Sequence, residues 1–544
     1  MFALGPLNEA IADAVPDQDA IICAQRRLSW RDFQLRSRRL ANVIHAAGLG
    51  CHRERDQLEP WESGQDHVAL YLYNGSEYLE GMIGGYKARV APFNVNYRYV
   101  EEELRYLFLD ARTKGIIYHA SFAPRLRAVL GDLPPQALLL QVDDGSGEPL
   151  LPGARDYEEA LAAAADALPP VTPREEDLYI LYTGGTTGMP KGVLWTQRDI
   201  FFAAMGGVLP AGMGTVESVA QMIERAPMGQ FIRSLPAPPF MHGAAQWASF
   251  MILHQGGAVV LPTNVRTLDA DDLWRTIERE RVGTLSIVGD AFARPLLDQL
   301  QQGTYDLSSL RVLGSGGAIL SPPFKEAFLD LLPDLMIFDG FGSSETGAQG
   351  AALTTKGDAV SPAFRMDDHT CVLDAALTRR LAPGDAETGW LARTGYLPLG
   401  YFNDAAKTRK TYPTIDGVRY AVPGDRAQAA ADGTVVVFGR DSVCINSGGE
   451  KIFAEEVEKA LKHHPAVYDC VVAGTPSARW GEQVTAVVQF RPGVHASDAE
   501  LLAEAAKHLA RYKLPKAFVA VEQIVRSASG KPDYRWAKQR AMKG

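Results

Sequence analysis

The chain has few of the features that mark several other classes of protein. Its five cysteines are scattered without any C-x-x-C spacing, which indicates neither a zinc site nor a disulfide framework. The chain contains no stretch of about eighteen apolar residues, the length that a membrane-spanning helix needs. Its start lacks the basic and apolar segments of a secretory signal. Positive charge is also in deficit: the formal net charge is −10, whereas a general nucleic-acid-binding protein needs a basic surface. We therefore expect a cytoplasmic, soluble protein with no transmembrane segment and no nucleic-acid partner.

The composition that remains is that of an ordinary globular protein. Hydrophobic residues make up 46% of the chain and charged residues 22%, which excludes a largely disordered chain. At 544 residues the chain exceeds what one hydrophobic core usually organises, so two or more domains are expected. Strand-like apolar runs, among them residues 68–72, 178–181 and 258–261, alternate with helix-length segments such as 269–281. This alternation predicts an α/β fold of parallel sheets covered by helices.

The pattern changes after Gly439. The elements predicted beyond it are a helix over 451–463, strands over 469–473 and 483–488, and a helix over 501–509. About a hundred residues of this kind make a small α+β domain in their own right. We therefore predict a large domain over residues 1–439 and a small one over 440–544, with a hinge near Ser442.

The most informative segment is a glycine-rich loop that follows the apolar run 178–181. Glycines allow positive φ and let backbone N–H groups approach an anion, threonines add hydroxyl donors, and a lysine adds positive charge. The segment therefore predicts a phosphate site at the carboxyl end of a strand. Its candidate phosphate-binding residues are Thr183, Gly184, Gly185, Thr186, Thr187, Gly188 and Lys191.

Two other interpretations of this loop were weighed. A P-loop needs Gly-x4-Gly-Lys-Ser/Thr, but the fifth residue after Gly184 is Met189 and the lysine is followed by Gly192, so the spacing fails. A flexible glycine-rich surface loop is the remaining alternative when the segment is taken alone. The preceding strand and the terminal lysine favour the phosphate site.

The segment from Tyr182 to Gly192 resembles the signature Tyr-Thr-x-Gly-Thr-Thr-Gly-x-Pro-Lys-Gly of the adenylate-forming enzymes. This superfamily contains acyl-CoA synthetases, peptide-synthetase adenylation domains and firefly-type luciferases. Further segments similar to the family's motifs follow in the family's order, at residues 238–243, 313–318, 339–345, 420–425, 445–452 and 526–535. The resemblance implies a large N-terminal domain of parallel sheets layered with helices and a small mobile C-terminal α+β domain.

The resemblance also implies an ATP site. Besides the glycine-rich loop it would use Gly316, Asp339, Gly340, Phe341, Ser344, Asp425 and Arg440. Glu345 would hold Mg²⁺, because this hard cation prefers oxygen ligands. The chain departs from the usual motifs where Phe341 replaces tyrosine, Ser344 replaces threonine and Pro423 replaces threonine. The ring and the hydroxyl that ATP binding needs are retained in the first two cases.

The remaining roles that the resemblance implies concern the acid, the thiol and the chemical step. Lys531 would deliver a cation to the α-phosphate, and His242 is the second catalytic candidate, with a positioning or gating role favoured over chemistry. The acyl site would contain His242, Trp247, Gly316 and Gly340. Gly448 and Gly449 would line the path of CoA, and Ser442 would be the hinge.

The implied reaction uses ATP, Mg²⁺ and CoA to convert a carboxylic acid to its thioester, with AMP and pyrophosphate as co-products. The nearest subgroup is the fatty-acid and steroid or terpenoid acyl-CoA synthetases, and the apolar residues near the acyl site favour a bulky hydrophobic acid. Alternatives are an acyl-AMP ligase that loads a carrier protein and a luciferase-like oxidase. A nucleotide-binding protein without turnover would require the loss of Lys531 or Glu345, and both are present. The sequence leaves the oligomeric state open, and a homodimer is one of the alternatives.

Overall fold

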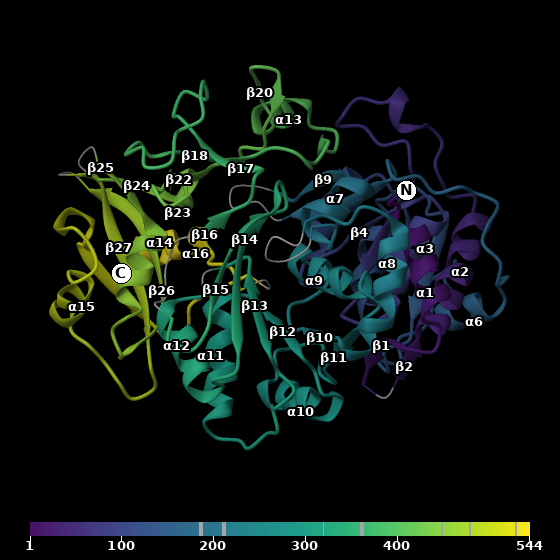
Figure 1. Cartoon of the computed structure of the whole chain (residues 1–544), viewed down its shortest axis with the longest axis horizontal. Helices are drawn as coiled ribbons and strands as arrows, with labels where there is room; N and C mark the ends of the chain where they lie inside the picture. Colours follow the sequence, from purple (N-terminus) through teal and green to yellow (C-terminus); the bar gives the residue numbers. More distant parts are fainter. Residues whose placement is uncertain are drawn as a thin grey trace.

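The computed structural model describes most of the chain, and Figure 1 shows its arrangement. It leaves out residues 25, 184–188, 209–213, 319, 359–363, 448–449, 478–479, 528–529 and 544, and the side chains of residues 440, 442, 446, 450 and 451.

The first sheet carries the strand before the glycine-rich loop. Its strands in the described residues are, in spatial order, β19 (Gly400–Tyr401), β9 (Lys191–Thr196), β8 (Leu178–Thr183), β4 (Ala91–Asn94), β3 (His67–Tyr71), β5 (Thr113–His119), β6 (Leu138–Val142) and β7 (Arg155–Asp156). Strands β8, β4, β3, β5, β6 and β7 run parallel, so their carboxyl ends share one edge. Its apolar runs are buried on both faces, as in a sheet covered by helices.

The second sheet is longer and changes character along its width. Its strands in the described residues are, in order, β17 (Thr370–Leu373), β18 (Gly389–Arg393), β22 (Asp425–Ala429), β23 (Thr434–Arg440), β16 (Phe364–Met366), β15 (Gly347–Thr354), β14 (Met336–Ser343), β13 (Val312–Gly316), β12 (Thr284–Ile287), β10 (Arg233–Pro236), β11 (Ala258–Leu261), β1 (Asp19–Cys23) and β2 (Arg26–Ser29). The strands from β14 to β1 pair in parallel, and those from β17 to β14 pair antiparallel.

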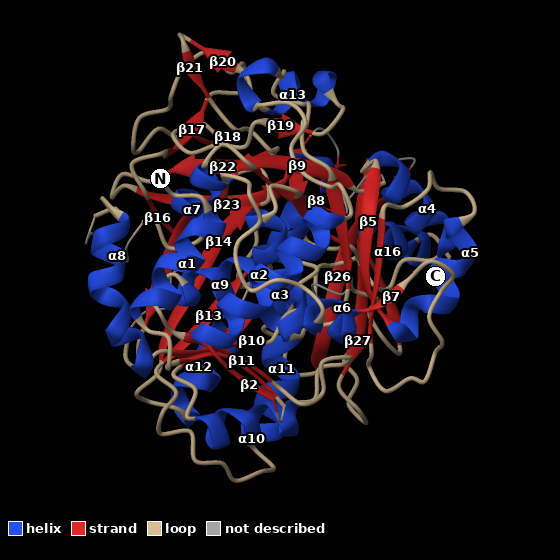
Figure 2. Cartoon of the chain, turned by 90° about the vertical axis from the view of Figure 1, so that its right-hand side faces the viewer, coloured by secondary structure: helices blue, strands red, loops and turns tan. Residues whose placement is uncertain are grey.

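Helices fill the space between these sheets and cover their outer faces (Figure 2). Helices α2 (Trp30–Ala46) and α3 (Ser76–Lys87) contact both β1 of the second sheet and each other, and α3 also contacts β3 and β4 of the first. The other helices of this region are α1 (Leu4–Ala14), α4 (Glu101–Asp110), α5 (Ala123–Leu130), α6 (Tyr157–Ala162), α7 (Gln197–Ala204), α8 (Val219–Arg225), α9 (Gly243–Leu253), α10 (Ala270–Glu280), α11 (Gly289–Leu300), α12 (Pro322–Leu331) and α13 (Ala405–Thr411). The predicted helix over 269–281 corresponds to α10, whose N-cap Asp269 accepts a hydrogen bond from the amide of Asp272.

The small C-terminal region forms its own sheet, drawn in yellow-green on the left of Figure 1. Its strands are β24 (Cys444–Ser447), β25 (Glu450–Phe453), β26 (Val467–Ser477), β27 (Gly481–Phe490) and β28 (Ala517–Val521), and its helices are α14 (Ala454–Leu461), α15 (Asp498–Ala505) and α16 (Tyr534–Ala541). The predicted strands over 469–473 and 483–488 pair as β26 and β27. The predicted α/β class, with a small α+β C-terminal part, is confirmed.

One predicted element is partly wrong. A helix was expected from residue 451, but residues 450–453 form β25, and the helix begins at Ala454. Residues 450–453 form a strand and not a helix because they pair with β24 in a hairpin. In this hairpin Ile452 is the Cα partner of Ile445, and both side chains are buried. The helical spacing of the apolar residues is therefore real from residue 454 onward but does not apply to residues 451–453.

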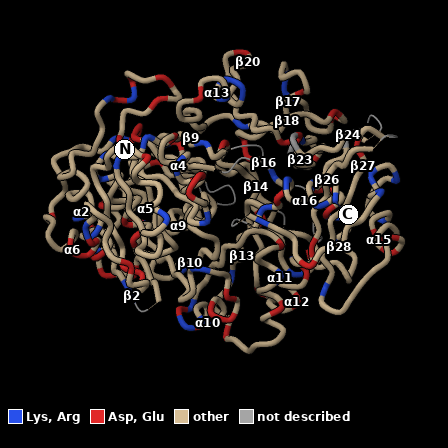
Figure 3. The backbone as a smooth tube through the Cα atoms, turned by 180° about the vertical axis from the view of Figure 1, so that it is seen from behind, with Lys and Arg blue, Asp and Glu red and all other residues tan. Residues whose placement is uncertain are grey.

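Acidic and basic residues are interspersed over the molecule (Figure 3). The arginine-rich start of α2 illustrates this, because Arg36 pairs with both Glu80 and Glu158. These two ion pairs join α2 to α3 and α6, the helices that carry Glu80 and Glu158. None of the helices among the described residues is long and apolar enough to cross a membrane.

Candidate active site

The glycine-rich segment connects two paired strands. β8 ends at Thr183 and β9 begins at Lys191, and these two residues are Cα partners in an antiparallel ladder. The residues between them that were predicted to bind phosphate, 184–188, lie outside the described residues. The Lys191 ammonium lies 3.7 Å from Oδ1 of Asp110 and 3.8 Å from Oδ2 of Asp404. Burial lowers the pKa of Lys191, but these carboxylates and Tyr106 outweigh it and raise the pKa, so the lysine keeps its charge.

Two glycines lie side by side at the end of β13 and in the middle of β14. Gly316 and Gly340 are Cα partners. A Cβ atom on Gly316 would lie 3.4 Å from the carbonyl oxygen of Gly340, and one on Gly340 would lie 3.4 Å from that of Ser315. A larger side chain at either position would therefore occupy the surface that a flat base or a thin acyl chain needs.

The neighbouring Asp339 is engaged with a residue that the sequence had not singled out. Its carboxylate forms an ion pair of 2.7 Å with Nζ of Lys325 on α12, and both side chains are buried. Burial raises the pKa of Asp339, and Lys325 opposes that rise. Lys325 therefore orients the carboxylate at the end of the strand.

The turn after β14 holds the predicted metal ligand. The Tyr401 hydroxyl donates a 2.8 Å hydrogen bond to Oε1 of Glu345, and the Trp195 indole donates a 3.0 Å bond to the carbonyl of Ser344. A carboxylate offers about four lone-pair directions, so the bond from Tyr401 leaves capacity for a cation. The donor set at this position therefore fits Mg²⁺, although no cluster of three metal-ligating side chains occurs in the described part of the chain. Phe341 lies two strand positions before Ser343, with its ring 5.7 Å from that of Phe364.

Asp425 and Arg440 are brought together by strand pairing. They are Cα partners at one end of the β22–β23 ladder, and Asp425 is buried. The side chain of Arg440 lies outside the described atoms. A buried carboxylate at a sheet end suits a pair of vicinal hydroxyls, which is the role that the resemblance implies for Asp425.

His242 is the N-cap residue of α9 and is half-buried, with its Nε2 atom buried. Its Nε2 atom has no hydrogen-bond partner within the described structure. Burial lowers the pKa of His242 to about 3, and the positive charges of Lys531 and Arg98 add to the shift. The imidazole is therefore neutral at physiological pH, which suits positioning of a polar ligand atom better than carrying charge.

Two asparagines hold the backbone around this histidine. The Asn74 side chain donates to the carbonyl of Pro238 at 3.1 Å and accepts from the amide of Phe240 at 2.6 Å. Asn94, at the end of β4, donates to the carbonyl of Met241 at 2.7 Å. Asn94 also exchanges two hydrogen bonds with the backbone of Tyr182, in the strand before the glycine-rich segment. No local pattern in the sequence predicts these bridging roles.

The predicted acyl-site residue Trp247 is fixed by a short hydrogen-bond chain. Its indole donates to the Tyr179 hydroxyl at 3.1 Å, and that hydroxyl donates to Oε1 of Gln246 at 2.7 Å. Buried Tyr and Trp side chains usually find such partners. Trp247 therefore presents a fixed ring one turn into the helix that His242 begins.

The loop that carries Lys531 packs against the large domain. Gly530 has a φ of +74°, and a Cβ atom there would lie 3.2 Å from Cβ of Ala291 near the start of α11. The glycine thus lets the loop before Lys531 pack closely on the large domain. The positive charge of Lys531 acts on His242, where it adds to the effect of burial in lowering the pKa of the histidine.

The predicted hinge lies at the connection between the small and the large domain. Ser442 lies in a short 3₁₀ helix, Asp441–Val443, between the last strand of the second sheet and β24. Gly448 and Gly449 lie outside the described residues.

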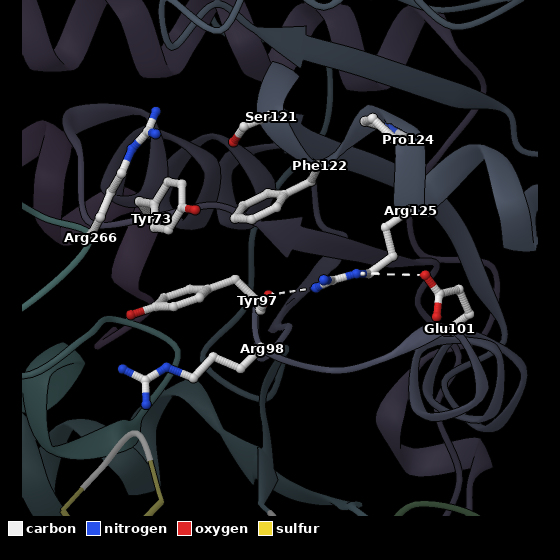
Figure 4. A pocket seen from close by; sticks show the side chains of 9 residues that line it. All are labelled: Tyr73, Tyr97, Arg98, Glu101, Ser121, Phe122, Pro124, Arg125 and Arg266. Atoms are coloured by element: carbon white, nitrogen blue, oxygen red, sulfur yellow. Dashed lines mark hydrogen bonds and ion pairs between the residues drawn. The ribbon is translucent and has the colours of Figure 1, made fainter.

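A pocket of about 610 Å³ lies among the loops that follow the parallel strands of the first sheet (Figure 4). It is lined by Tyr73, Tyr97, Arg98, Glu101, Ser121, Phe122, Pro124, Arg125 and Arg266. Most of these residues directly follow β3, β4 and β5, so the pocket lies at the carboxyl edge of the first sheet. The Arg266 guanidinium lies 5.3 Å from the ring of Tyr73, and Arg125 donates to the carbonyl of Tyr97. Three guanidinium groups and three aromatic rings thus share one opening.

The fold is that of an α/β protein with two large sheets layered with helices and a small C-terminal α+β part. The sequence profile of the AMP-binding enzyme family matches residues 8–391, and that of the AMP-binding enzyme C-terminal domain matches residues 456–531. The chain therefore belongs to the AMP-binding enzyme family, the adenylate-forming superfamily that its motifs predicted.

Similar proteins cover the whole length of the chain. A medium-chain acyl-CoA ligase, Mig, from Mycobacterium avium is 51% identical over 100% of this chain and 99% of its own. A medium/long-chain fatty-acid and 3-oxocholest-4-en-26-oate CoA ligase from Mycobacterium tuberculosis is 42% identical over 98% of this chain and 95% of its own. Among solved structures, the anthranilate CoA ligase AuaEII in complex with anthranoyl-AMP has a TM-score of 0.82 at 21% identity, covering 99% of this chain and 98% of that one.

Proposed function

We propose that this protein is an acid–thiol ligase that converts a bulky hydrophobic carboxylic acid, ATP and CoA to an acyl-CoA, AMP and pyrophosphate. The observation that carries the proposal is that the positive charge of Lys531, on the small domain, acts on the neutral His242 of the large domain and adds to the lowering of its pKa. The family membership and the full-length similarity to CoA ligases support the same reaction. The cytoplasm, where ATP and CoA are available, is the proposed site of the reaction.

In the proposed first step, a carboxylate oxygen of the acid attacks the α-phosphorus of ATP. A new P–O bond forms, the bond to the β-phosphate oxygen breaks, and pyrophosphate leaves. Lys531 offsets the negative charge that builds on the α-phosphate, and the Nε2 atom of His242 offers a polar contact to the acid's carboxylate end. The protein thus contributes position and counter-charge, and no side chain needs to become acylated.

The remaining predicted ATP contacts are proposed in the same roles. Mg²⁺, when bound by Glu345 and phosphate oxygens, supplies further counter-charge. Lys191 faces the phosphates, Gly316 and Gly340 leave room for adenine and the acyl chain, and Asp425 holds the ribose. The Tyr401 hydroxyl orients the Glu345 carboxylate for this task.

In the proposed second step, the CoA sulfur attacks the acyl carbon of the adenylate. A C–S bond forms, the C–O bond to the phosphate breaks, and AMP leaves with the electron pair. The lysine is not needed for charge in this step, because the bond to the α-phosphorus is no longer being made. The small domain, proposed as residues 440–544, must therefore present a different surface to the adenylate.

The pocket lined by Arg98, Arg125 and Arg266 supports CoA as the thiol. CoA carries several phosphate groups and an adenine ring, which match the guanidinium groups of Arg98, Arg125 and Arg266 and the rings of Tyr97 and Phe122. The phosphopantetheine arm of a carrier protein lacks the nucleotide that would use this pocket. The pocket therefore favours an acyl-CoA ligase over an acyl-AMP ligase that loads a carrier protein.

Replacing Arg98 tests this assignment. We expect Arg98→Ala to raise the KM for CoA about tenfold, since a hydrogen bond to a charged group contributes about 1.5–3 kcal/mol, and to leave acid-dependent pyrophosphate exchange into ATP nearly unchanged. The matched control is Arg105→Ala, which removes a partly exposed arginine paired with Asp132 in the turn after α5. An unchanged KM for CoA, or equal losses in both half-reactions, would contradict the assignment.

A panel of acids tests the proposed substrate class. Phe240, Trp247 and Phe250 are apolar residues on and before α9, and each added buried methylene contributes about 0.8 kcal/mol at most. We therefore expect kcat/KM to rise steeply from acetate to medium- and long-chain fatty acids, and a steroid side-chain acid to be accepted. Acetate giving the highest kcat/KM in a mixed panel would contradict this class.

A further inference from the structure

The interface between α11 and the small domain is built around a buried ion pair. Nζ of Lys462, the residue after α14, lies 3.1 Å from Oδ2 of Asp290 at the start of α11. The two side chains are 9% and 7% exposed. Burial lowers the pKa of Lys462, but the carboxylates of Asp290 and Asp469 outweigh it and raise the pKa, so the ammonium stays charged. One cation of the small domain is thus held by a carboxylate of the large one.

The large domain holds its side of this pair in place. The Ser321 amide donates to Oδ1 of Asp290 at 2.7 Å, and the Ser321 hydroxyl donates to Oδ2. Asp290 also lies in the first turn of α11, where a negative charge is favoured by the helix dipole. Contacts within the large domain alone therefore orient the Asp290 carboxylate that accepts the ion pair from Lys462.

On the small domain, the ion pair continues toward the catalytic lysine. Lys462 lies 3.5 Å from Oδ1 of Asp469, and Arg526 binds both oxygens of Asp469 at 2.7 Å. Another nitrogen of Arg526 donates to the carbonyl of Gly530 at 2.9 Å. The next residue is Lys531. An unbroken series of contacts therefore links Asp290 of the large domain to the backbone that presents Lys531.

An arginine between two rings closes the same interface. The Arg294 guanidinium, on α11, lies 4.7 Å from the ring of Phe324 on α12 and 4.3 Å from the ring of Tyr468 on β26. One ring belongs to each domain. Cation–π contacts of a desolvated arginine are directional and are lost when one ring moves away. Arg294 thus depends on the small domain being in this orientation.

We propose that Asp290, Arg294, Lys462 and Tyr468 form an interdomain latch that holds the small domain with Lys531 in the site for adenylate formation and that must open for thioester formation. The inference rests on the proposed two-step reaction. These four are positioning residues, because they act on the reaction through the placement of Lys531. A ligand-independent contact between domains can favour one orientation only by the free energy it contributes in that orientation.

Lys462→Met tests the latch because it removes the charge and keeps most of the side-chain volume. We expect the rate of acid-dependent pyrophosphate exchange into ATP to fall about tenfold or more. Removing Lys462 leaves the charge of Asp290 buried without its partner, which disfavours this orientation of the small domain. Thioester formation from a supplied acyl-adenylate should keep at least its wild-type rate. The matched control, Lys538→Met, removes a lysine of the same domain whose partner Glu482 is also in that domain, and both half-reactions should stay unchanged.

Two further variants keep the test valid if Lys462→Met folds poorly. Asp290→Asn with Lys462→Met removes both charges, and Arg294→Leu leaves the ion pair intact while losing the contact with Tyr468. Each should show the same loss of adenylation with thioester formation retained, at an unchanged melting temperature. The double variant should lose less than the sum of its two single variants, because they break one interaction.

Two outcomes would overturn the latch. The first is an equal fall of both half-reactions in correctly folded variants, which would show a merely structural role. The second is no change in either rate. Failure of the wild-type protein to form adenylate and thioester at all would instead contradict the proposed function, so the two ideas fail in distinguishable ways.

Discussion

Lys531→Ala is expected to abolish adenylate formation while sparing the second half-reaction. Removing one group that stabilises a charged transition state costs about 3–4 kcal/mol, which corresponds to a loss of about two to three orders of magnitude in rate. The lysine approaches the site closely enough to lower the pKa of His242, and its loop packs on Ala291 of the large domain. Pyrophosphate exchange into ATP, dependent on the acid, measures the first half-reaction directly.

The second half-reaction is measured with a supplied acyl-adenylate and CoA. Thioester formation by Lys531→Ala should stay close to the wild-type rate, because the lysine's charge is needed only while the α-phosphate is under attack. Lys507→Ala, an exposed lysine paired with Glu504 on the same domain, is the control and should change neither rate. Equal loss of both half-reactions would remove Lys531 from the role of transition-state cation.

Ser442→Pro is expected to separate the half-reactions in the opposite sense. Ser442 lies in the 3₁₀ helix between the last strand of the second sheet and β24, so the small domain can rotate only if the backbone near this residue changes. Proline fixes φ near about −65°, which a 3₁₀ helix accepts but a different hinge conformation does not. The variant should therefore keep pyrophosphate exchange and slow thioester formation by about a hundredfold or more, as for other enzymes whose turnover requires a domain motion.

The matched control for the hinge is Ser442→Ala, which removes the hydroxyl without restricting φ. It should keep both rates. A Ser442→Pro variant with a normal melting temperature and normal rates in both half-reactions would show that the hinge lies elsewhere or that no rotation is required.

The opposite effects predicted for the latch and the hinge follow from one idea. Opening the contact between Asp290 and Lys462 weakens the orientation that makes the adenylate, whereas stiffening Ser442 keeps the small domain in it. Combining Lys462→Met with Ser442→Pro should therefore recover part of the adenylation rate lost in Lys462→Met alone. The structure thus connects two distant parts of the small domain to one equilibrium.

The amino-acid sequence predicts the elements and motifs better than it predicts the contacts between them. The strands around 178–181 and 483–488 follow from local apolar runs, and they form as β8 and β27. The family motifs locate Lys531, Glu345 and Asp425 because their spacing along the chain is characteristic. Local spacing fails at residue 451, where a hairpin partner earlier in the chain decides the structure.

The supporting contacts have no local signature. Tyr401 reaches Glu345 across 56 residues, Asn94 reaches Met241 across 147, and Lys462 reaches Asp290 across 172. In each case a common side chain acquires its role from a partner that the fold brings close. Such pairs cannot be predicted from one sequence, because neither residue is unusual among its neighbours in the chain.

The phosphorus-containing products of one reaction test the central claim most directly. A medium-chain fatty acid, ATP, Mg²⁺ and CoA are incubated with the protein, and nucleotides, phosphates and thioester are quantified together. The account predicts AMP, pyrophosphate and acyl-CoA in equal amounts, with no acyl-CoA when ATP is omitted. ADP and inorganic phosphate as the stoichiometric products, or AMP without any thioester, would contradict it.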